Sequence, residues 1–106
     1  MNFMKYIFLA LCIAAASAVA APDCAGIDAG TKAYNGGDFE RAIDEWRTCA
    51  DNGTPDADLL YNLGNAYFRS GKIGFAIYYY RSALRLRPGD DDIQHNLKFA
   101  QAMTRD

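Results

Sequence analysis

The feature that most constrains this chain is an internal repeat with a period of 34 residues. One ungapped offset aligns glycines, small residues and an arginine across two segments. The identical pairs are Gly30 and Gly64, Gly37 and Gly71, Ala42 and Ala76, Ile43 and Ile77, and Arg47 and Arg81. Repeats with periods of about 20–50 residues are typical of stacked supersecondary units, none of which buries its apolar face alone. The pattern therefore predicts a stack of such units rather than a domain with one deep core.

The second copy of the repeat, residues 57–90, carries two apolar stripes at helical spacing. Residues of the first stripe recur every three or four positions, at Leu59, Leu60, Leu63, Ala66 and Tyr67. The second stripe begins at Ile73 and is followed by Pro88 and Gly89. This spacing predicts helices over 57–70 and 73–86, and Gly71 between them suits a left-handed cap. Two antiparallel helices joined by a short turn are expected.

The first copy follows the same scheme. We expect helices over 24–35 and 39–50, joined by a turn at Gly36 and Gly37. Residues 51–55, Asp-Asn-Gly-Thr-Pro, have the composition of a connector. The whole chain is therefore predicted to be all-α.

A last helix is predicted over residues 91–105. The acidic run Asp90–Asp92 precedes its apolar stripe and suits a helix N-cap. A calcium site is the alternative for this run, but the sequence lacks the rest of a ligand loop. Lys98 stands at the position that Gly64 has one repeat earlier. A long charged side chain there suits a capping helix on which nothing packs.

Residues 57–90 resemble a tetratricopeptide repeat. The positions that match the family pattern are Leu60, Leu63, Gly64, Tyr67, Ala76, Tyr80, Ala83 and Pro88. Residues 23–56 are a divergent copy, which departs from the pattern at Ala33 and Pro55. The resemblance implies two helical hairpins, at 23–56 and 57–90, followed by a capping helix at 91–106. It also implies a non-catalytic scaffold that binds a protein or peptide partner.

Residues 77–100 are similar to the repeat segment of bacterial aerotolerance-operon (Bat) proteins. The similarity rests on the run from Ile77 to Pro88 and the run from Asp92 to Ala100. Proteins of that group are exported and usually continue beyond this helix into membrane spans. The similarity implies a place in the bacterial cell envelope, with membrane association through a region that would follow Asp106.

The first 20 residues have the pattern of a secretory signal peptide. Lys5 supplies the positive charge, residues 6–16 are apolar, and Ala18-Val19-Ala20 forms the small-residue end. We place the cut after Ala20, because a cut one residue later would leave Pro22 directly after the scissile bond. The chain is therefore expected to be exported, to the periplasm or the cell envelope.

Two alternatives remain for this N-terminal segment. One is an uncleaved membrane anchor, although the apolar run is shorter than the roughly 20 residues that a spanning helix needs. The other is lipoprotein modification at Cys12, although Leu11 precedes it where a lipobox has a small residue.

Cys24 and Cys49 remain in the exported chain. They lie near opposite ends of two predicted antiparallel helices, an arrangement that brings them within reach of a disulfide. Closing a loop of about 25 residues would stabilise the fold by roughly 3 kcal/mol in the entropic model. Two free buried thiols and a redox-active pair are the alternatives, and the sequence has no Cys-x-x-Cys site.

Charge and motif content argue against several classes of function. The formal net charge is −2, so a polybasic surface for nucleic acid is not expected. His95 is the only histidine, and no second element supports a nucleophilic or metal site around it. The glycines recur at the repeat period, which indicates packing and turns rather than a phosphate-binding loop. We therefore predict no enzymatic activity and no catalytic, cofactor-binding or metal-binding residues.

The resemblance places a binding face on the first helix of each unit. The predicted peptide-binding residues are Tyr34, Tyr61, Asn65, Phe68, Arg69, His95 and Phe99. Aromatic faces beside Asn and Arg suit an extended peptide, because the Asn65 amide can pair with a main-chain amide. Simple packing is the alternative role for Tyr61, Phe68 and Phe99.

Some family members clamp a carboxylate with lysine, asparagine and arginine on these helices. Asn65 matches one asparagine of that set, but Ile27 and Asp92 stand where lysines are needed. A ligand tail of the Glu-Glu-Val-Asp type is therefore not expected.

Three consecutive tyrosines, Tyr78–Tyr80, favour a second functional hypothesis. They cannot all point inward from one helix, so Tyr80 is assigned to the core and Tyr78 or Tyr79 to the surface. An exposed tyrosine there favours a self-associating structural module, a homo-oligomer, as the alternative to peptide binding. A thiol-redox protein using Cys24 and Cys49 is a more distant alternative.

Overall fold

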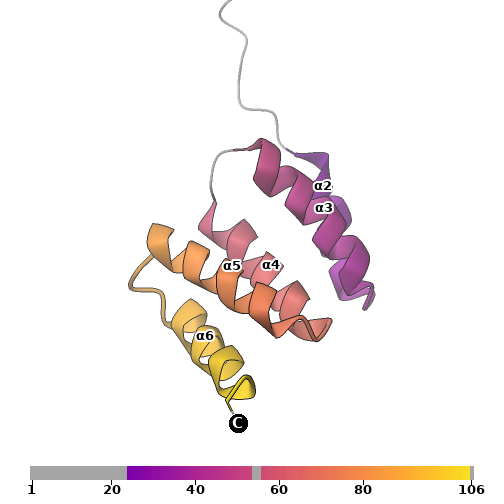
Figure 1. The fold of residues 1–106 in the computed structure, drawn as a ribbon. Coiled ribbons are helices and arrows are strands. Elements are labelled where there is room, and N and C mark those ends of the chain that lie inside the picture. Colours follow the sequence, from indigo (N-terminus) through magenta and orange to yellow (C-terminus); the bar gives the residue numbers. More distant parts are fainter. Residues whose placement is uncertain (1–23, 54–55, 106) are drawn as a thin grey trace, which may run out of the picture.

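The computed structural model describes residues 24–53 and 56–105, and these fold into a stack of α-helices (Figure 1). The helices are α2 (Ala25–Asn35), α3 (Phe39–Asn52), α4 (Ala57–Arg69), α5 (Ile73–Leu86) and α6 (Asp91–Met103). The pairs α2–α3 and α4–α5 form two hairpins, and α6 packs on α5. The all-α prediction, with two hairpins and a capping helix, is confirmed. The predicted signal peptide lies outside the described residues, and within them no helix is both long and apolar enough to cross a membrane.

Aspartate side chains cap the N-termini of three helices. Asp38 accepts a hydrogen bond from the Arg41 backbone N–H at the start of α3, and Asp56 caps α4 in the same manner. At the start of α6, Asp90 accepts from the Ile93 N–H at 3.0 Å. These bonds satisfy backbone donors that have no partner within the helix. The acidic run therefore supplies the N-cap of α6, Asp90, as predicted, while Asp91 and Asp92 lie in its first turn.

Glycines with positive φ close both hairpins. Gly37 has φ of 83° and Gly71 has φ of 80°, a region that side chains disfavour. Both lie two residues past the end of the preceding helix, where a left-handed residue lets the chain reverse. The turn chemistry predicted from the repeat is confirmed at both positions.

Two helix ends differ from the prediction by two residues, because side chains act there. Helix α3 runs to Asn52, two residues into the expected connector, and the Asn52 side chain donates to the Thr48 carbonyl at 3.0 Å. Helix α6 ends at Met103 rather than at 105, where the Thr104 hydroxyl donates to the Gln101 carbonyl. Such side-chain bonds to nearby carbonyls compete with or extend the backbone hydrogen bonds of a helix. They do not change the spacing of apolar residues, so the sequence pattern does not predict them.

Close helix contact explains two other glycines. A Cβ at Gly64 would lie 2.5 Å from the Tyr80 ring, and a Cβ at Gly30 would overlap the Trp46 ring. Tyr80 and Trp46 are only 1% and 3% exposed. Each glycine thus lets a large ring of the second helix pack against the backbone of the first. Lys98, at the corresponding position of α6, is exposed, as expected for a helix on which nothing packs.

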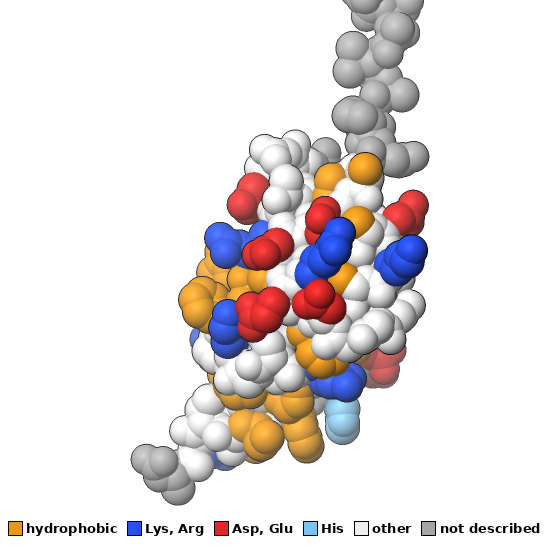
Figure 2. All heavy atoms as spheres, turned by 90° about the vertical axis from the view of Figure 1, so that its right-hand side faces the viewer, with side chains coloured by type: hydrophobic (Ala, Val, Ile, Leu, Met, Phe, Trp, Pro, Cys, Tyr) orange, Lys and Arg blue, Asp and Glu red, His pale blue; other side chains and the backbone are white. Residues whose placement is uncertain are grey.

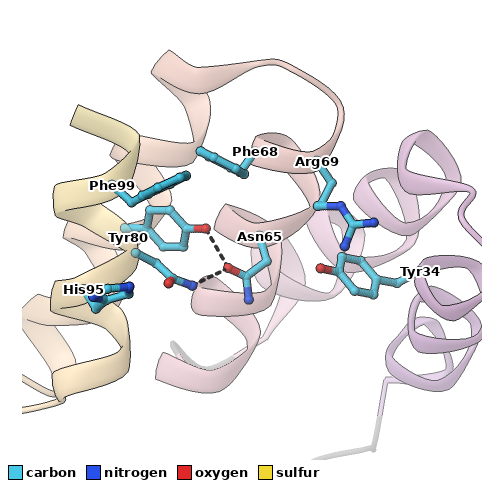
Figure 3. A pocket seen from close by; sticks show the side chains of 8 residues that line it. Tyr34, Asn65, Phe68, Arg69, Tyr80, His95 and Phe99 are labelled. Atoms are coloured by element: carbon cyan, nitrogen blue, oxygen red, sulfur yellow. Dashed lines mark hydrogen bonds between the residues drawn. The ribbon is translucent and has the colours of Figure 1, made fainter. Parts of the chain in front are cut away.

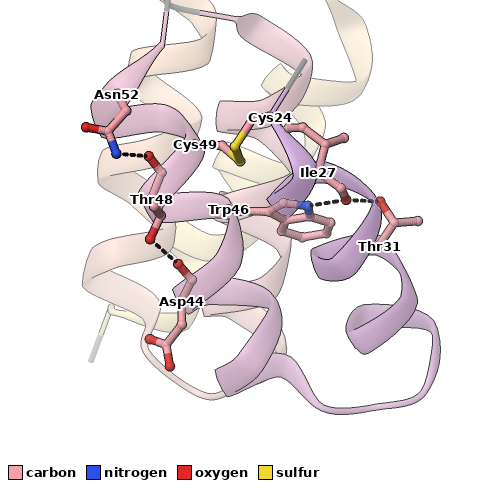
Figure 4. The surroundings of a disulfide bond; sticks show 8 residues. All are labelled: Cys24, Ile27, Thr31, Asp44, Trp46, Thr48, Cys49 and Asn52. Atoms are coloured by element: carbon pink, nitrogen blue, oxygen red, sulfur yellow. Dashed lines mark hydrogen bonds between the residues drawn. A yellow bond between two sulfur atoms is a disulfide. The ribbon is translucent and has the colours of Figure 1, made fainter. Parts of the chain in front are cut away.

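A disulfide joins Cys24 to Cys49, with the two Cα atoms 5.7 Å apart (Figure 4). It ties the N-cap residue of α2 to α3. One turn into α2, the Trp46 indole N–H donates to the Ile27 carbonyl at 3.1 Å. The first hairpin is therefore held by a covalent bond, a cross-helix hydrogen bond and the Gly30–Trp46 contact.

Candidate peptide-binding groove

A groove of about 370 Å³ opens where α2, α4 and α6 face one another (Figure 3). Its lining residues come from the first helix of each hairpin and from α6, with one contribution from α5. They are Tyr34, Asn65, Phe68, Arg69, Tyr80, His95, Asn96 and Phe99. The groove is larger than the lower end of the range for small-ligand pockets, about 300 Å³.

A hydrogen-bond network fixes the polar centre of the groove. The Tyr80 hydroxyl donates to the Asn65 Oδ1 at 2.6 Å, and the Asn96 side-chain amide donates to the same oxygen at 3.1 Å. Asn96 also donates to the Tyr61 hydroxyl at 2.8 Å. The Asn65 oxygen thus accepts two bonds. Among the described residues its amide nitrogen has no partner, and it points away from Tyr80 (Figure 3).

This network changes the role expected for Asn65. An amide oxygen has two lone pairs, and both are used within the protein. The available function is the Nδ2 donor, which suits a main-chain carbonyl rather than a main-chain N–H. Burial raises the pKa of the Tyr80 hydroxyl well above its usual range, and Tyr61 adds to the shift. Tyr80 therefore stays protonated and keeps donating to Asn65.

One end of the groove is apolar. The Phe68 and Phe99 rings contact each other with their centroids 5.6 Å apart. Phe99 is 55% exposed, and Met103, one turn further along α6, is also largely exposed. In Figure 2, hydrophobic side chains gather beside the single histidine, His95, at the lower end of the molecule. This end offers apolar surface to a ligand.

The opposite end is cationic. The exposed guanidinium of Arg69 lies over the Phe39 ring, 4.7 Å from its centroid. Tyr34 packs beside it, with its ring centroid 5.2 Å from that of Phe39 and 5.7 Å from that of Trp46. Arg69 has no ion pair with any part of the chain that the structure describes. A positioned, unpaired guanidinium suits a carboxylate.

A family model described as tetratricopeptide repeat matches residues 27–91 of the chain. The chain belongs to the tetratricopeptide repeat family. No curated protein matches it. Tetratricopeptide repeats generally bind protein partners and are typically non-catalytic scaffolds. The more specific likeness to Bat proteins stays a prediction.

The structure brings six of the seven predicted site residues of this tetratricopeptide protein together. Tyr34, Asn65, Phe68, Arg69, His95 and Phe99 all line the groove. Tyr61 lies behind the lining, with its ring 5.9 Å from that of Tyr80, and accepts the bond from Asn96. It thus packs on Tyr80 and takes part in the hydrogen-bond network, and its predicted part in peptide binding stays a prediction. Whether the six bind a peptide stays a prediction.

Sequence reasoning missed two groove residues, Tyr80 and Asn96. Helical periodicity correctly placed the Tyr80 ring in the core, but it does not show that the hydroxyl reaches the groove. Asn96 repeats Asn62 at the 34-residue offset, and that recurrence was the one available signal. In the described part of the chain, no cluster of His, Cys, Asp and Glu has the arrangement of a metal site.

The outer surface of α5 carries the other tyrosines of the run in this tetratricopeptide protein. Tyr78 is 59% exposed, whereas Tyr79 is half-buried and stacks on Tyr67 with centroids 5.3 Å apart. Burial raises the pKa of Tyr79. The prediction that Tyr80 is in the core and one neighbour is exposed is confirmed.

Proposed function

We propose that this protein is a non-catalytic scaffold that holds an extended segment of a partner protein in the groove between α2, α4 and α6. The observation that carries the proposal is the Asn65 side chain. Two hydrogen bonds to its oxygen fix the amide, and its nitrogen, in an open groove, has no partner among the described residues. A pre-positioned donor of this kind binds at a low entropic cost.

The ends of the groove suggest which peptide it accepts. A main-chain carbonyl would take the Asn65 Nδ2 donor, and an apolar side chain would lie against Phe68 and Phe99. A carboxylate on the other side would pair with Arg69. The preferred segment therefore carries an apolar residue and an acidic residue on either side of the carbonyl.

We propose the bacterial cell envelope as the location, with the mature chain exported to the periplasm. The signal-peptide pattern of residues 1–20 and the similarity to Bat proteins support this location. The Cys24–Cys49 disulfide also supports it, because disulfides persist in oxidising compartments. Self-association and membrane association through a region beyond Asp106 are further predictions.

Site-specific photo-crosslinking tests the proposed function. A benzophenone amino acid placed at Phe99 would keep an aromatic ring in the groove, and the same amino acid at Lys98 is the control on the same helix. We expect a partner to be crosslinked in cells from position 99 and not from position 98. Equal crosslinking from both positions, or none from position 99, would contradict the proposal.

A further inference from the structure

Gly74 is a glycine that the fold does not explain. Gly30 and Gly64 leave room for the rings of Trp46 and Tyr80, and Gly37 and Gly71 have positive φ. Gly74 is the second residue of α5, its φ is not positive, and a Cβ added to it would meet nothing within 4 Å. Glycine is a poor helix former compared with alanine. A side chain is thus absent here without a reason in packing or backbone conformation.

Gly74 lines an aromatic hollow of about 420 Å³. Its lining residues are Arg47, Tyr67, Gly74, Phe75, Tyr78 and Tyr79. The Tyr67 ring stacks with the Phe75 ring at 5.1 Å and with the Tyr79 ring at 5.3 Å between centroids. Tyr78 stands edge-on to Tyr79 at 5.0 Å. None of these residues lines the peptide groove.

The hollow is exposed and bordered by arginines, with one acidic residue, Asp51, close enough to act on Arg47 and Tyr79. Phe75 and Tyr78 are 58% and 59% exposed. Arg47 lies at the hollow, and Arg81 and Arg85 continue along α5, which contains no Asp or Glu. These three arginines form no ion pair with the residues of 24–53 and 56–105. Aromatic residues and arginine together are the composition of interface hot spots.

We propose that this hollow is a second binding site, for a segment of a partner protein that presents a large apolar side chain beside a carboxylate. The side chain enters over Gly74 and stacks on the tyrosine and phenylalanine rings, and the carboxylate pairs with Arg47. A concave site suits one protruding side chain, whereas a lipid surface is flat. The protein would then join two partners, one in the groove and one at the hollow.

Amide NMR with short peptide probes tests this site. The probe is acetyl-Asp-Trp-Asp-amide, and acetyl-Asp-Ala-Asp-amide and acetyl-Lys-Trp-Lys-amide are the control peptides. We expect the acidic tryptophan peptide to shift the Gly74 and Phe75 amide signals saturably. The dissociation constant should be at least tenfold larger for each control peptide. In a Gly74→Leu variant, the dissociation constant of the acidic tryptophan peptide, measured from the Phe75 shifts, should also be at least tenfold larger.

Gly89→Leu is the matched control variant, because a Cβ at Gly89 also meets nothing within 4 Å. It should bind the probe as the wild type does. The Gly74→Leu variant should still crosslink its partner from position 99, which separates this site from the proposed groove function. The proposal is overturned if the probe does not shift Gly74, or if Gly74→Leu binds it equally well. It is also overturned if the hollow instead responds to phosphatidylglycerol vesicles or to a second copy of the chain in a dilution series.

Discussion

At the scale of single residues, the fold depends on two contacts between a glycine and an aromatic ring. Gly64 faces Tyr80, and Gly30 faces Trp46, in equivalent places of the two hairpins. The sequence repeat predicted small residues at these places, because both glycines recur at the same offset. The repeat did not predict that the Tyr80 hydroxyl donates to Asn65 and orients it. Periodicity assigns a side chain to a face of the helix, but it does not show which atoms the end of that side chain contacts.

We predict that Gly64→Ala destabilises the protein by about 1–3 kcal/mol, because the new Cβ would lie 2.5 Å from the Tyr80 ring. Gly74→Ala is the matched control, with open space around the new Cβ. It should be neutral or stabilising by up to about 1 kcal/mol. Midpoints of urea denaturation measure both effects. Equal midpoints for the two variants would contradict the assigned contact.

We predict that the stability contributed by Tyr80 depends on pH. Burial raises its pKa in the folded state above the unfolded value, so this stability is fully present below about pH 10 and is lost as the pH rises further. Tyr80→Phe should cost about 1 kcal/mol at pH 8 through the lost bond to Asn65. The difference between wild type and variant in urea midpoints should shrink at pH 11. A difference that grows with pH would show that the hydroxyl is not buried in its neutral form.

At the scale of helices, the elements were predictable because the repeat period and the apolar spacing agree. The helix pairs, the turn glycines and the aspartate cap of α6 all follow from local sequence. The exact ends of α3 and α6 did not follow, because Asn52 and Thr104 act through side-chain bonds to nearby carbonyls. The antiparallel arrangement of the predicted helices favours a Cys24–Cys49 disulfide over free thiols or a redox-active pair, and the structure contains this disulfide.

We predict that the disulfide stabilises the first hairpin by roughly 3 kcal/mol. A Cys24→Ala/Cys49→Ala variant should therefore have a lower urea midpoint than the oxidised wild type. In dithiothreitol the wild type should fall close to the variant, since only the covalent link separates them. Identical urea midpoints for the wild type with and without dithiothreitol, together with two free thiols in the unreduced protein, would show that the disulfide is absent.

At the scale of the whole molecule, helices adjacent in sequence make the main contacts, in the order α2–α3–α4–α5–α6. Stability in such stacks is approximately a sum of neighbour terms. The groove, in contrast, needs residues of α2, α4 and α6 together. Six of the predicted binding residues line it, and their role in binding stays a prediction. Its depth and its hydrogen-bond network depend on how the hairpins stack, which no local pattern records.

The central claim is that the free Nδ2 of Asn65 binds a main-chain carbonyl of the partner. Asn65→Asp tests it most directly, because the carboxylate can still accept from Tyr80 and Asn96 while the donor is lost. The measurement is the dissociation constant, by titration calorimetry, of the partner segment that the crosslinking identifies. Asn35→Ala is the control, at an exposed asparagine. We predict binding at least tenfold weaker for Asn65→Asp and unchanged for Asn35→Ala, with unchanged helicity. Wild-type affinity in Asn65→Asp would contradict the account.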